Sequence, residues 1–150
     1  MANRKLGHLA DLGVATRGRD LRPAIDAVKS RARTLTQLAH RVAVRLDPSR
    51  AALEPKGEAL ITKMGAAYRE NLRHALAVLG PIPEAEWRAD RILEAVKAGA
   101  EAGGIKLGDV MQPIRVALTG DTVSEPVNEL LAVVGKAVAL ARLELVAGRA

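Results

Sequence analysis

Apolar residues recur at intervals of three and four along most of the chain, and this spacing limits the folds that the chain can adopt. Leu35, Leu38, Val42 and Leu46 form one such set, and similar sets continue toward the C-terminal end. The spacing places apolar side chains on one face of an α-helix, whereas a half-buried strand requires strict alternation. No segment alternates in that way, and no unit repeats. The sequence therefore predicts an all-α fold, a multihelical globule with short connections.

Prolines and glycines mark where the expected helices of the first half end. One helix is expected to follow Asp20 as its N-cap, and the next to stop at Asp47-Pro48, because a residue before proline disfavours helical geometry. Residues 58–79 form one long amphipathic segment, which the Gly-Pro-Ile-Pro sequence at residues 80–83 would end. That break divides the expected fold into a basic helical subdomain at residues 1–80 and a C-terminal helical subdomain at residues 81–150.

The second half of the chain predicts four further helices. One is expected from Glu84 to about Ala102, and another over residues 104–120. Ser124 is expected to cap the third, and Gly135 to separate it from the last.

Pro113 interrupts the helical pattern of residues 104–120, which read GIKLGDVMQPIRVALTG. A proline inside a helix removes a hydrogen bond and costs about 3 kcal/mol. Two arrangements fit the pattern: Pro113 begins a new turn after an N-cap at Gln112, or it kinks one continuous helix. In both, Arg115 is displayed at a bend while Ile114 and Leu118 stay in the core.

The composition restricts the core and the compartment. Hydrophobic residues make up 49% of the chain, but the aromatic residues are one Trp and one Tyr, so the core must be aliphatic. Cysteine is absent, which excludes disulfides and thiolate metal sites. No apolar run approaches the roughly 20 residues of a membrane-spanning helix, and the first residues lack the apolar core of a signal peptide. A cytoplasmic protein is expected.

Positive charge is concentrated in the first third of the chain. Residues 1–50 carry 11 Lys and Arg against 4 Asp, a net charge of +7, whereas residues 51–150 carry 12 basic and 13 acidic residues. Nine of the 11 basic residues are arginines, whose planar guanidinium suits phosphate. A polyanion such as nucleic acid is one interpretation, and a solvated basic surface is the other.

The sequence lacks the usual signatures of an enzyme. Gly103-Gly104 has neither the spacing nor the following Lys-Ser/Thr of a phosphate-binding loop. His8, His40 and His74 are isolated, without a ligand partner at the helical spacing of a zinc site. No serine stands in a nucleophile-elbow pattern. The sequence therefore predicts no catalytic residue, no metal site and no cofactor.

Residues 104–120, with residues 121–144 that follow (DTVSEPVNELLAVVGKAVALARLE), resemble the C-terminal end of bacterial glutamyl-tRNA synthetases. Residues 28–39 (VKSRARTLTQLA) are similar to an earlier segment of that family, and Trp87 falls where the family usually has a tryptophan. The resemblance covers about residues 20–146. It implies a tRNA anticodon-binding region, an all-helical cage of two subdomains. The catalytic half of that family carries two ATP-binding signatures, which do not occur here, so the resemblance implies a non-catalytic chain.

The resemblance also implies roles for arginines in binding tRNA, with tRNA-Glu as the expected partner. Arg31 and Arg33 would contact the anticodon stem-loop, including a base edge, and Arg41 and Arg45 would contact phosphate. A second wall of the binding site would be formed by Arg115, Thr119 and Gly120. A separate synthetase catalytic domain is a further expected partner, since the chain is either an excised fragment or a free-standing relative.

Three positions depart from the family pattern. Asp121 replaces a basic residue, and Glu125 and Asn128 fall in a segment where the family has an aromatic residue. Because unstacked RNA bases are commonly held by aromatic or arginine side chains, weaker tRNA binding than in the family is expected. The alternative function is a helical protein-interaction module that keeps the fold and has lost specific RNA recognition.

Overall fold

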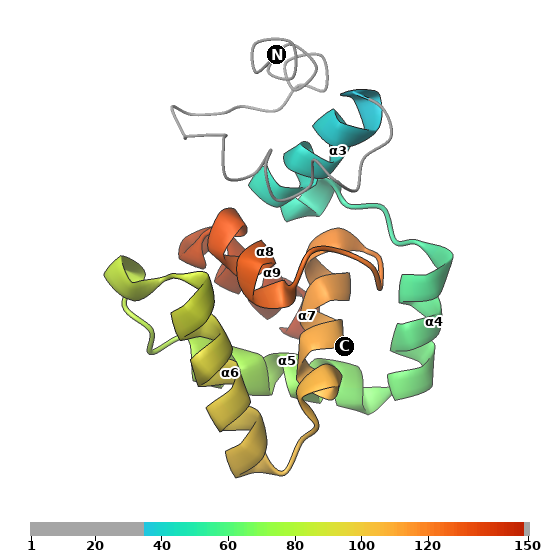
Figure 1. Ribbon diagram of the computed structural model, residues 1–150. Helices are drawn as coiled ribbons and strands as arrows, with labels where there is room; N and C mark the ends of the chain where they lie inside the picture. The colour runs from blue at the N-terminus through green and yellow to red at the C-terminus, as the bar shows by residue number, and fades with distance from the viewer. Residues whose placement is uncertain (1–34, 149–150) are drawn as a thin grey trace.

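The computed structural model describes residues 35–148, and over this range the chain is helical without a β-strand. The two 3₁₀ helices are η1 (Pro48–Arg50) and η2 (Glu84–Glu86). The α-helices, shown in Figure 1, are α3 (Leu35–Leu46), α4 (Pro55–Met64), α5 (Ala66–Leu79), α6 (Ala89–Gly103), α7 (Leu107–Thr119), α8 (Val127–Val134) and α9 (Lys136–Gly148). The predicted all-α fold is confirmed. The helix expected after Asp20 lies outside the described residues.

The main hydrophobic cluster is aliphatic, as the composition predicts. Helix α5 packs against α6, α7 and α9, and α8 packs between α6 and α9. A fully buried Leu or Ile contributes about 1.5–3 kcal/mol, so the stability of this body depends mainly on shape-matched aliphatic packing. Trp87 is half-buried, and its indole Nε1 donates to the Leu131 carbonyl at 2.8 Å. The largest buried members of the cluster include Leu72, Leu79, Ile92, Ile114, Leu130 and Leu143.

Helix α3 ends at the predicted position. It stops at Leu46, and Asp47 then caps η1, because its carboxylate oxygen Oδ1 accepts from the Ser49 amide at 3.2 Å. Pro48 is well placed at the start of η1, where a helix needs no N–H donor.

The single long helix predicted for residues 58–79 is wrong. The structure has two helices, α4 and α5, separated by Gly65 with φ 57°. A positive φ of this kind is readily adopted by glycine because it lacks a Cβ atom. The apolar spacing continues across the break, so the periodicity alone could not reveal it. The end of α5 at Leu79 agrees with the prediction.

The segment predicted as one helix from Glu84 also differs in its start. Glu84–Glu86 form the 3₁₀ helix η2, and α6 begins only at Ala89. Its end at Gly103, followed by Gly104 in the left-handed conformation, agrees with the expected C-terminal glycines.

Pro113 lies within one continuous helix, α7, so the alternative in which it begins a new turn after Gln112 is wrong. In a regular helix the amide of residue 113 would donate to the carbonyl of Asp109, four residues earlier. Proline has no such donor. The side-chain amide of Asn71 on α5 donates to that Asp109 carbonyl at 2.9 Å instead. A neighbouring helix therefore replaces the hydrogen bond that Pro113 removes.

Ser124 does not cap α8 as expected. The helix begins at Val127 after Pro126, and the Ser124 hydroxyl donates to the Glu125 carbonyl at 2.6 Å. Gly135 does separate α8 from α9, as predicted.

Helix α4 approaches the end of α7 through two glycines. The Glu54 amide donates to the Gly120 carbonyl at 2.9 Å. A Cβ atom added to Gly57 would lie 2.3 Å from the Gly120 carbonyl oxygen, and one added to Gly120 would lie 2.1 Å from the Ala52 carbonyl oxygen. Gly120 also has φ 77°. Contact between main chains thus sets the position of α4.

The division into subdomains at residue 80 stays a prediction.

None of the helices within residues 35–148 has the length and apolar character needed to cross a bilayer.

Candidate nucleic-acid interface

A cleft of about 110 Å³ lies between α3, the segment after η1 and the end of α7. Polar and charged groups occur at its rim together with the exposed side chain of Val123. The cleft brings together three of the predicted RNA-binding residues, Arg41, Arg45 and Thr119, from segments that are far apart in the sequence. Its lining residues are His40, Arg41, Val44, Arg45, Ala52, Glu54, Thr119, Asp121 and Val123.

Helix α3 presents Arg41 to this cleft. His40 beside it is exposed, whereas Leu38, Ala39 and Val42 are buried on the opposite face of the helix. The amphipathic pattern read from the sequence thus places Arg41 at a surface, where a guanidinium can reach phosphate.

Thr119 and Gly120 shape the opposite wall. The Thr119 hydroxyl donates to the Arg115 carbonyl at 2.8 Å and accepts from the Asp121 amide at 3.2 Å. Gly120 is buried against the backbone of Ala52, so its contribution to this wall is conformational. Together these contacts fix the turn that carries Asp121.

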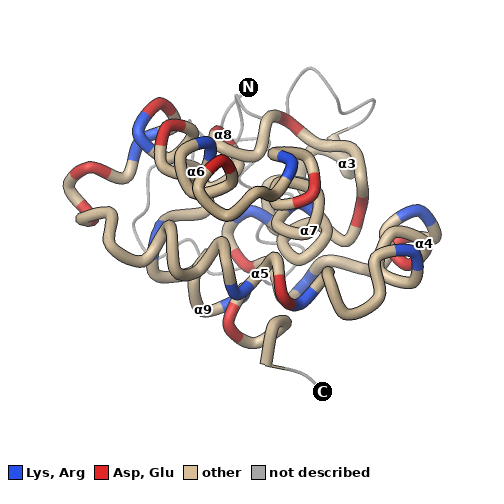
Figure 2. Tube along the Cα trace, turned by 90° about the horizontal axis from the view of Figure 1, so that it is seen from below, with Lys and Arg blue, Asp and Glu red and all other residues tan. Residues whose placement is uncertain are grey.

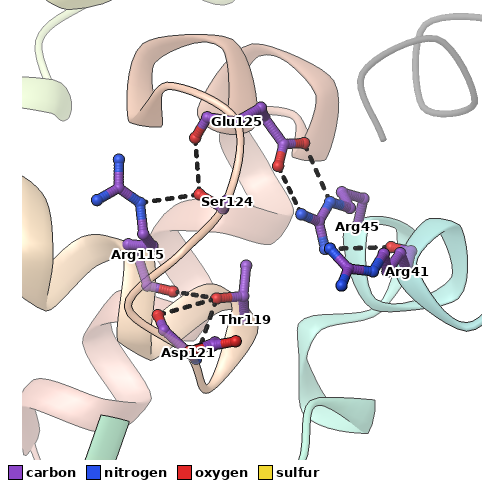
Figure 3. Close-up of polar contacts among 7 residues, drawn as sticks. All are labelled: Arg41, Arg45, Arg115, Thr119, Asp121, Ser124 and Glu125. Atoms are coloured by element: carbon purple, nitrogen blue, oxygen red, sulfur yellow. Dashed lines mark hydrogen bonds and ion pairs between the residues drawn. The ribbon is translucent and has the colours of Figure 1, made fainter. Parts of the chain in front are cut away.

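Arg115 contacts the segment that follows this turn, at Ser124. Its Nε donates to the Ser124 hydroxyl oxygen at 2.8 Å, and the side chain is half-buried. Figure 3 shows Arg115 and Arg45 reaching the Ser124–Glu125 segment from opposite sides. Arg115 is therefore held by the protein at the edge of this region.

Arg45 has a partner within the protein. It forms an ion pair with Glu125, in which Nη2 donates to Oε1 at 2.5 Å and Nε donates to Oε2 at 3.1 Å. Arg45 is 4% exposed and Glu125 is 2% exposed. A cation buried and neutralised in this way is poorly placed to bind phosphate. We therefore leave Arg45 out of the proposed RNA contacts.

The three residues that departed from the family pattern have different surroundings. Glu125 is buried in its ion pair, and the Asn128 side chain donates from Nδ2 to the Ala89 carbonyl at 3.1 Å. Asp121 lines the cleft, and its Oδ1 accepts from the Thr122 amide at 2.7 Å. Only Asp121 of these three places a carboxylate at the cleft.

The described helical body carries no net charge. Residues 35–148 contain 14 Lys and Arg and 14 Asp and Glu, and Figure 2 shows the two signs interspersed over the helices. Residues 1–34, which include Arg31 and Arg33, contain 8 basic and 3 acidic residues and lie outside the described residues. Most of the positive excess therefore precedes α3 in the sequence.

A second cleft, of about 200 Å³, is lined by Ala51, Leu53 and Gly120 together with residues of α4, α5, α7 and α9. Burial raises the pKa of Tyr68, which lines it, to about 12, although the charges of Arg142 and Arg69 oppose that shift. Arg142 donates from Nε to the Ala117 carbonyl at 2.9 Å. Within residues 35–148, no three potential metal ligands gather at one point.

The family of anticodon binding domains matches this chain over residues 5–147. The chain belongs to this family. The resemblance read from residues 104–144 is thereby confirmed.

The relatives of this anticodon-binding domain are longer proteins. A glutamate–tRNA ligase of Azorhizobium caulinodans is 37% identical over 143 residues, which are 95% of this chain and 28% of that protein. Glutamate–tRNA ligase 1 of Methylorubrum extorquens is 42% identical over 120 residues, covering 80% of this chain and 24% of the relative. The chain thus spans about a quarter of the length of these relatives.

A solved structure shares the fold of this anticodon-binding domain. It is the crystal structure of a glutamate tRNA ligase from Elizabethkingia meningosepticum in complex with its amino acid. The match has a TM-score of 0.73 and 22% identity, and covers 97% of this chain and 28% of the other.

Sequence reasoning missed one contact beside the interface and one within the helical body. Arg45 and Glu125 lie 80 residues apart, and Asn71 and Asp109 lie 38 residues apart. The buried position of Arg45 on α3 gave the one available signal, since the residue follows the apolar residues Val42 and Val44. Nothing in the sequence around Glu125 indicated that this residue is the partner of Arg45.

Proposed function

We propose that this chain is a non-catalytic tRNA-binding module that contacts the anticodon stem-loop of tRNA-Glu. The observation that carries the proposal is the match to the anticodon-binding domain family over residues 5–147. The relatives named above are glutamate–tRNA ligases, which suggests tRNA-Glu as the RNA and a synthetase catalytic domain as a protein partner.

The proposed contacts combine the cleft with the basic residues that precede α3. Arg41 binds phosphate at the rim of the cleft, and Arg115 with the Thr119-Gly120 turn forms the second wall. Arg31 and Arg33 contribute contacts to the stem-loop, including a base edge. Because the described body is neutral, a few well-placed arginines provide the affinity in this proposal, and binding weakens as salt rises.

The alternative function is a module that binds a protein partner. Fewer surface residues favour it in the structure than in the sequence. Two of the three residues that favoured it, Glu125 and Asn128, have partners within the protein. Asp121 at the cleft still favours a partner that carries positive charge. A binding experiment with RNA decides between the two functions.

The first experiment is a titration of the purified chain with tRNA-Glu, with the same tRNA carrying a changed anticodon, and with an unrelated tRNA. It is run at about 150 mM salt, where weak surface attraction is screened. An anticodon-binding module prefers tRNA-Glu and loses that preference when the anticodon is changed. Equal, weak binding to all three RNAs that disappears with added salt contradicts the proposal and favours the protein-interaction module.

A further inference from the structure

The buried ion pair between Arg45 and Glu125 joins two segments that the proposed function requires to be aligned. Arg45 belongs to α3, the helix that carries Arg41, and Glu125 belongs to the segment between α7 and α8. Both side chains are almost fully buried, and two hydrogen bonds connect them. A bidentate pair of this geometry fixes orientation as well as distance.

The buried side chains of α3 do not belong to the main hydrophobic cluster, so the ion pair is a specific polar connection between this helix and the rest of the body. That cluster takes its fully buried members from α5 to α9 and from residue 82, among the residues that the structure describes. Helix α3 contacts α7 and α8, and it lies at one end of the helical body. Apolar contacts resist separation, but they tolerate small sliding and rotation more readily than a bidentate ion pair does.

The same guanidinium also reaches the turn that carries Arg41. Nη1 of Arg45 donates to the Arg41 carbonyl at 3.3 Å, as Figure 3 shows. The carboxylate of Glu125 is thus linked through one side chain to the backbone of the residue at the cleft. On the other side, Ser124 accepts from Arg115 at 2.8 Å, so two adjacent residues hold both arginines.

We propose that Glu125 is a positioning residue for RNA binding, which acts through Arg45 to hold α3 so that Arg41 faces the cleft. This inference rests on the proposed tRNA-binding function. It reverses the simplest expectation for an acidic residue in an RNA-binding region, since removal of a negative charge ordinarily strengthens binding to a polyanion.

The test compares two variants that each lose one negative charge from the full chain. Glu125→Gln removes the buried carboxylate, and Glu129→Gln removes an exposed one on α8. Affinity for tRNA-Glu is measured for both at the same salt concentration. The inference predicts that Glu125→Gln weakens binding by about tenfold while Glu129→Gln leaves it unchanged or slightly stronger. Binding by Glu125→Gln that equals or exceeds that of Glu129→Gln overturns it.

A double-mutant cycle with Arg41→Gln distinguishes positioning from a general loss of structure. If Glu125 acts through Arg41, Glu125→Gln has little further effect in the Arg41→Gln background, because the contact that it positions is already lost. If the two losses simply add, Glu125 does not act through Arg41, and the inference is overturned.

A third variant keeps the test valid if Glu125→Gln fails to fold. Replacement of both partners, Arg45→Met with Glu125→Leu, fills the site with apolar side chains, and such replacements commonly preserve stability. Its folding is checked by circular dichroism and thermal unfolding. Weaker tRNA binding by this folded variant supports the inference, and wild-type affinity overturns it. If the wild-type chain itself fails to bind tRNA-Glu, the proposed function fails first.

Discussion

Arg41 and Arg45 lie one helical turn apart on α3, yet their surroundings differ. Arg41 lines the cleft, whereas Arg45 is 4% exposed and is neutralised by Glu125. The free energy of a charged guanidinium depends on its exposure to water and on nearby charges. Two arginines on one helix can therefore differ in role, one available to a ligand and the other held in an internal ion pair. A single-residue prediction for this chain therefore has to begin with burial.

Tyr68 provides a prediction that depends on burial in this way. Because the pKa of Tyr68 in the folded protein is about 12, the folded state keeps the phenol proton at a pH where the unfolded state loses it. Stability from this group is complete below about pH 10 and is lost as the pH rises through about 12, with a total loss of about 2–3 kcal/mol. We expect Tyr68→Phe to remove this part of the pH dependence.

The measurement for Tyr68 uses urea unfolding of the wild type and of Tyr68→Phe at about pH 8 and about pH 11. The wild type should lose about 1–1.5 kcal/mol more than the variant between the two conditions. Since Tyr68 is the one tyrosine of the chain, tyrosinate absorbance follows its titration directly. A midpoint near 10 in the folded protein would contradict the prediction.

At the scale of elements, the helix ends that depend on local chemistry were predictable and the breaks that depend on tertiary contact were not. The ends at Leu46 and Leu79 follow from the prolines and glycines that come next. The break at Gly65 was hidden because the apolar spacing of α4 continues into α5. A glycine within a periodic segment is compatible with both a continuous helix and a break, and packing decides between them.

Helix α7 supplies the prediction at this scale. Asn71→Ala should reduce the free energy of unfolding by about 0.5–1 kcal/mol, because the Asp109 carbonyl loses its donor at a position that water can partly reach. In a Pro113→Ala background the amide of residue 113 can restore the helical bond, so the same Asn71 substitution should cost less. Thermal or urea unfolding of the four proteins measures the coupling.

Equal losses from Asn71→Ala in both backgrounds would show that Asn71 does not compensate for the proline. Asn71→Ala should leave the helical content unchanged in both cases, which circular dichroism checks.

At the scale of the whole molecule, the net positive charge is distributed unevenly along the sequence. The body of residues 35–148 is neutral, and the excess of basic residues lies in residues 1–34. The positions of the charged residues predicted this asymmetry, and the spacing of the apolar residues predicted the all-α fold. The geometry of the candidate site could not be predicted, because the Arg45–Glu125 contact and the Gly57–Gly120 approach join segments 80 and 63 residues apart, whose proximity arises only when the chain packs.

The asymmetry predicts where the salt dependence of tRNA binding originates. Replacement of Arg31 and Arg33 by Gln should lower the slope of log affinity against log salt by about one to two, because each phosphate contact contributes about 0.7–0.9. The matched control, Arg88→Gln with Arg91→Gln, removes the same charge from the N-terminal end of α6, where Arg88 is the N-cap, and should leave the slope nearly unchanged. Equal changes in the two double variants would mean that net charge alone attracts the RNA.

The approach of Gly57 to Gly120 has a consequence for how this domain can change during evolution. In a side-chain contact, a substitution that enlarges one partner can be compensated by a smaller residue opposite. Here the partners are main-chain atoms, with would-be Cβ positions 2.3 Å and 2.1 Å from carbonyl oxygens. No substitution opposite can create room, so neither glycine can be replaced unless the path of the backbone moves. Descendants of this chain should therefore keep both glycines, or lose them together with the placement of α4.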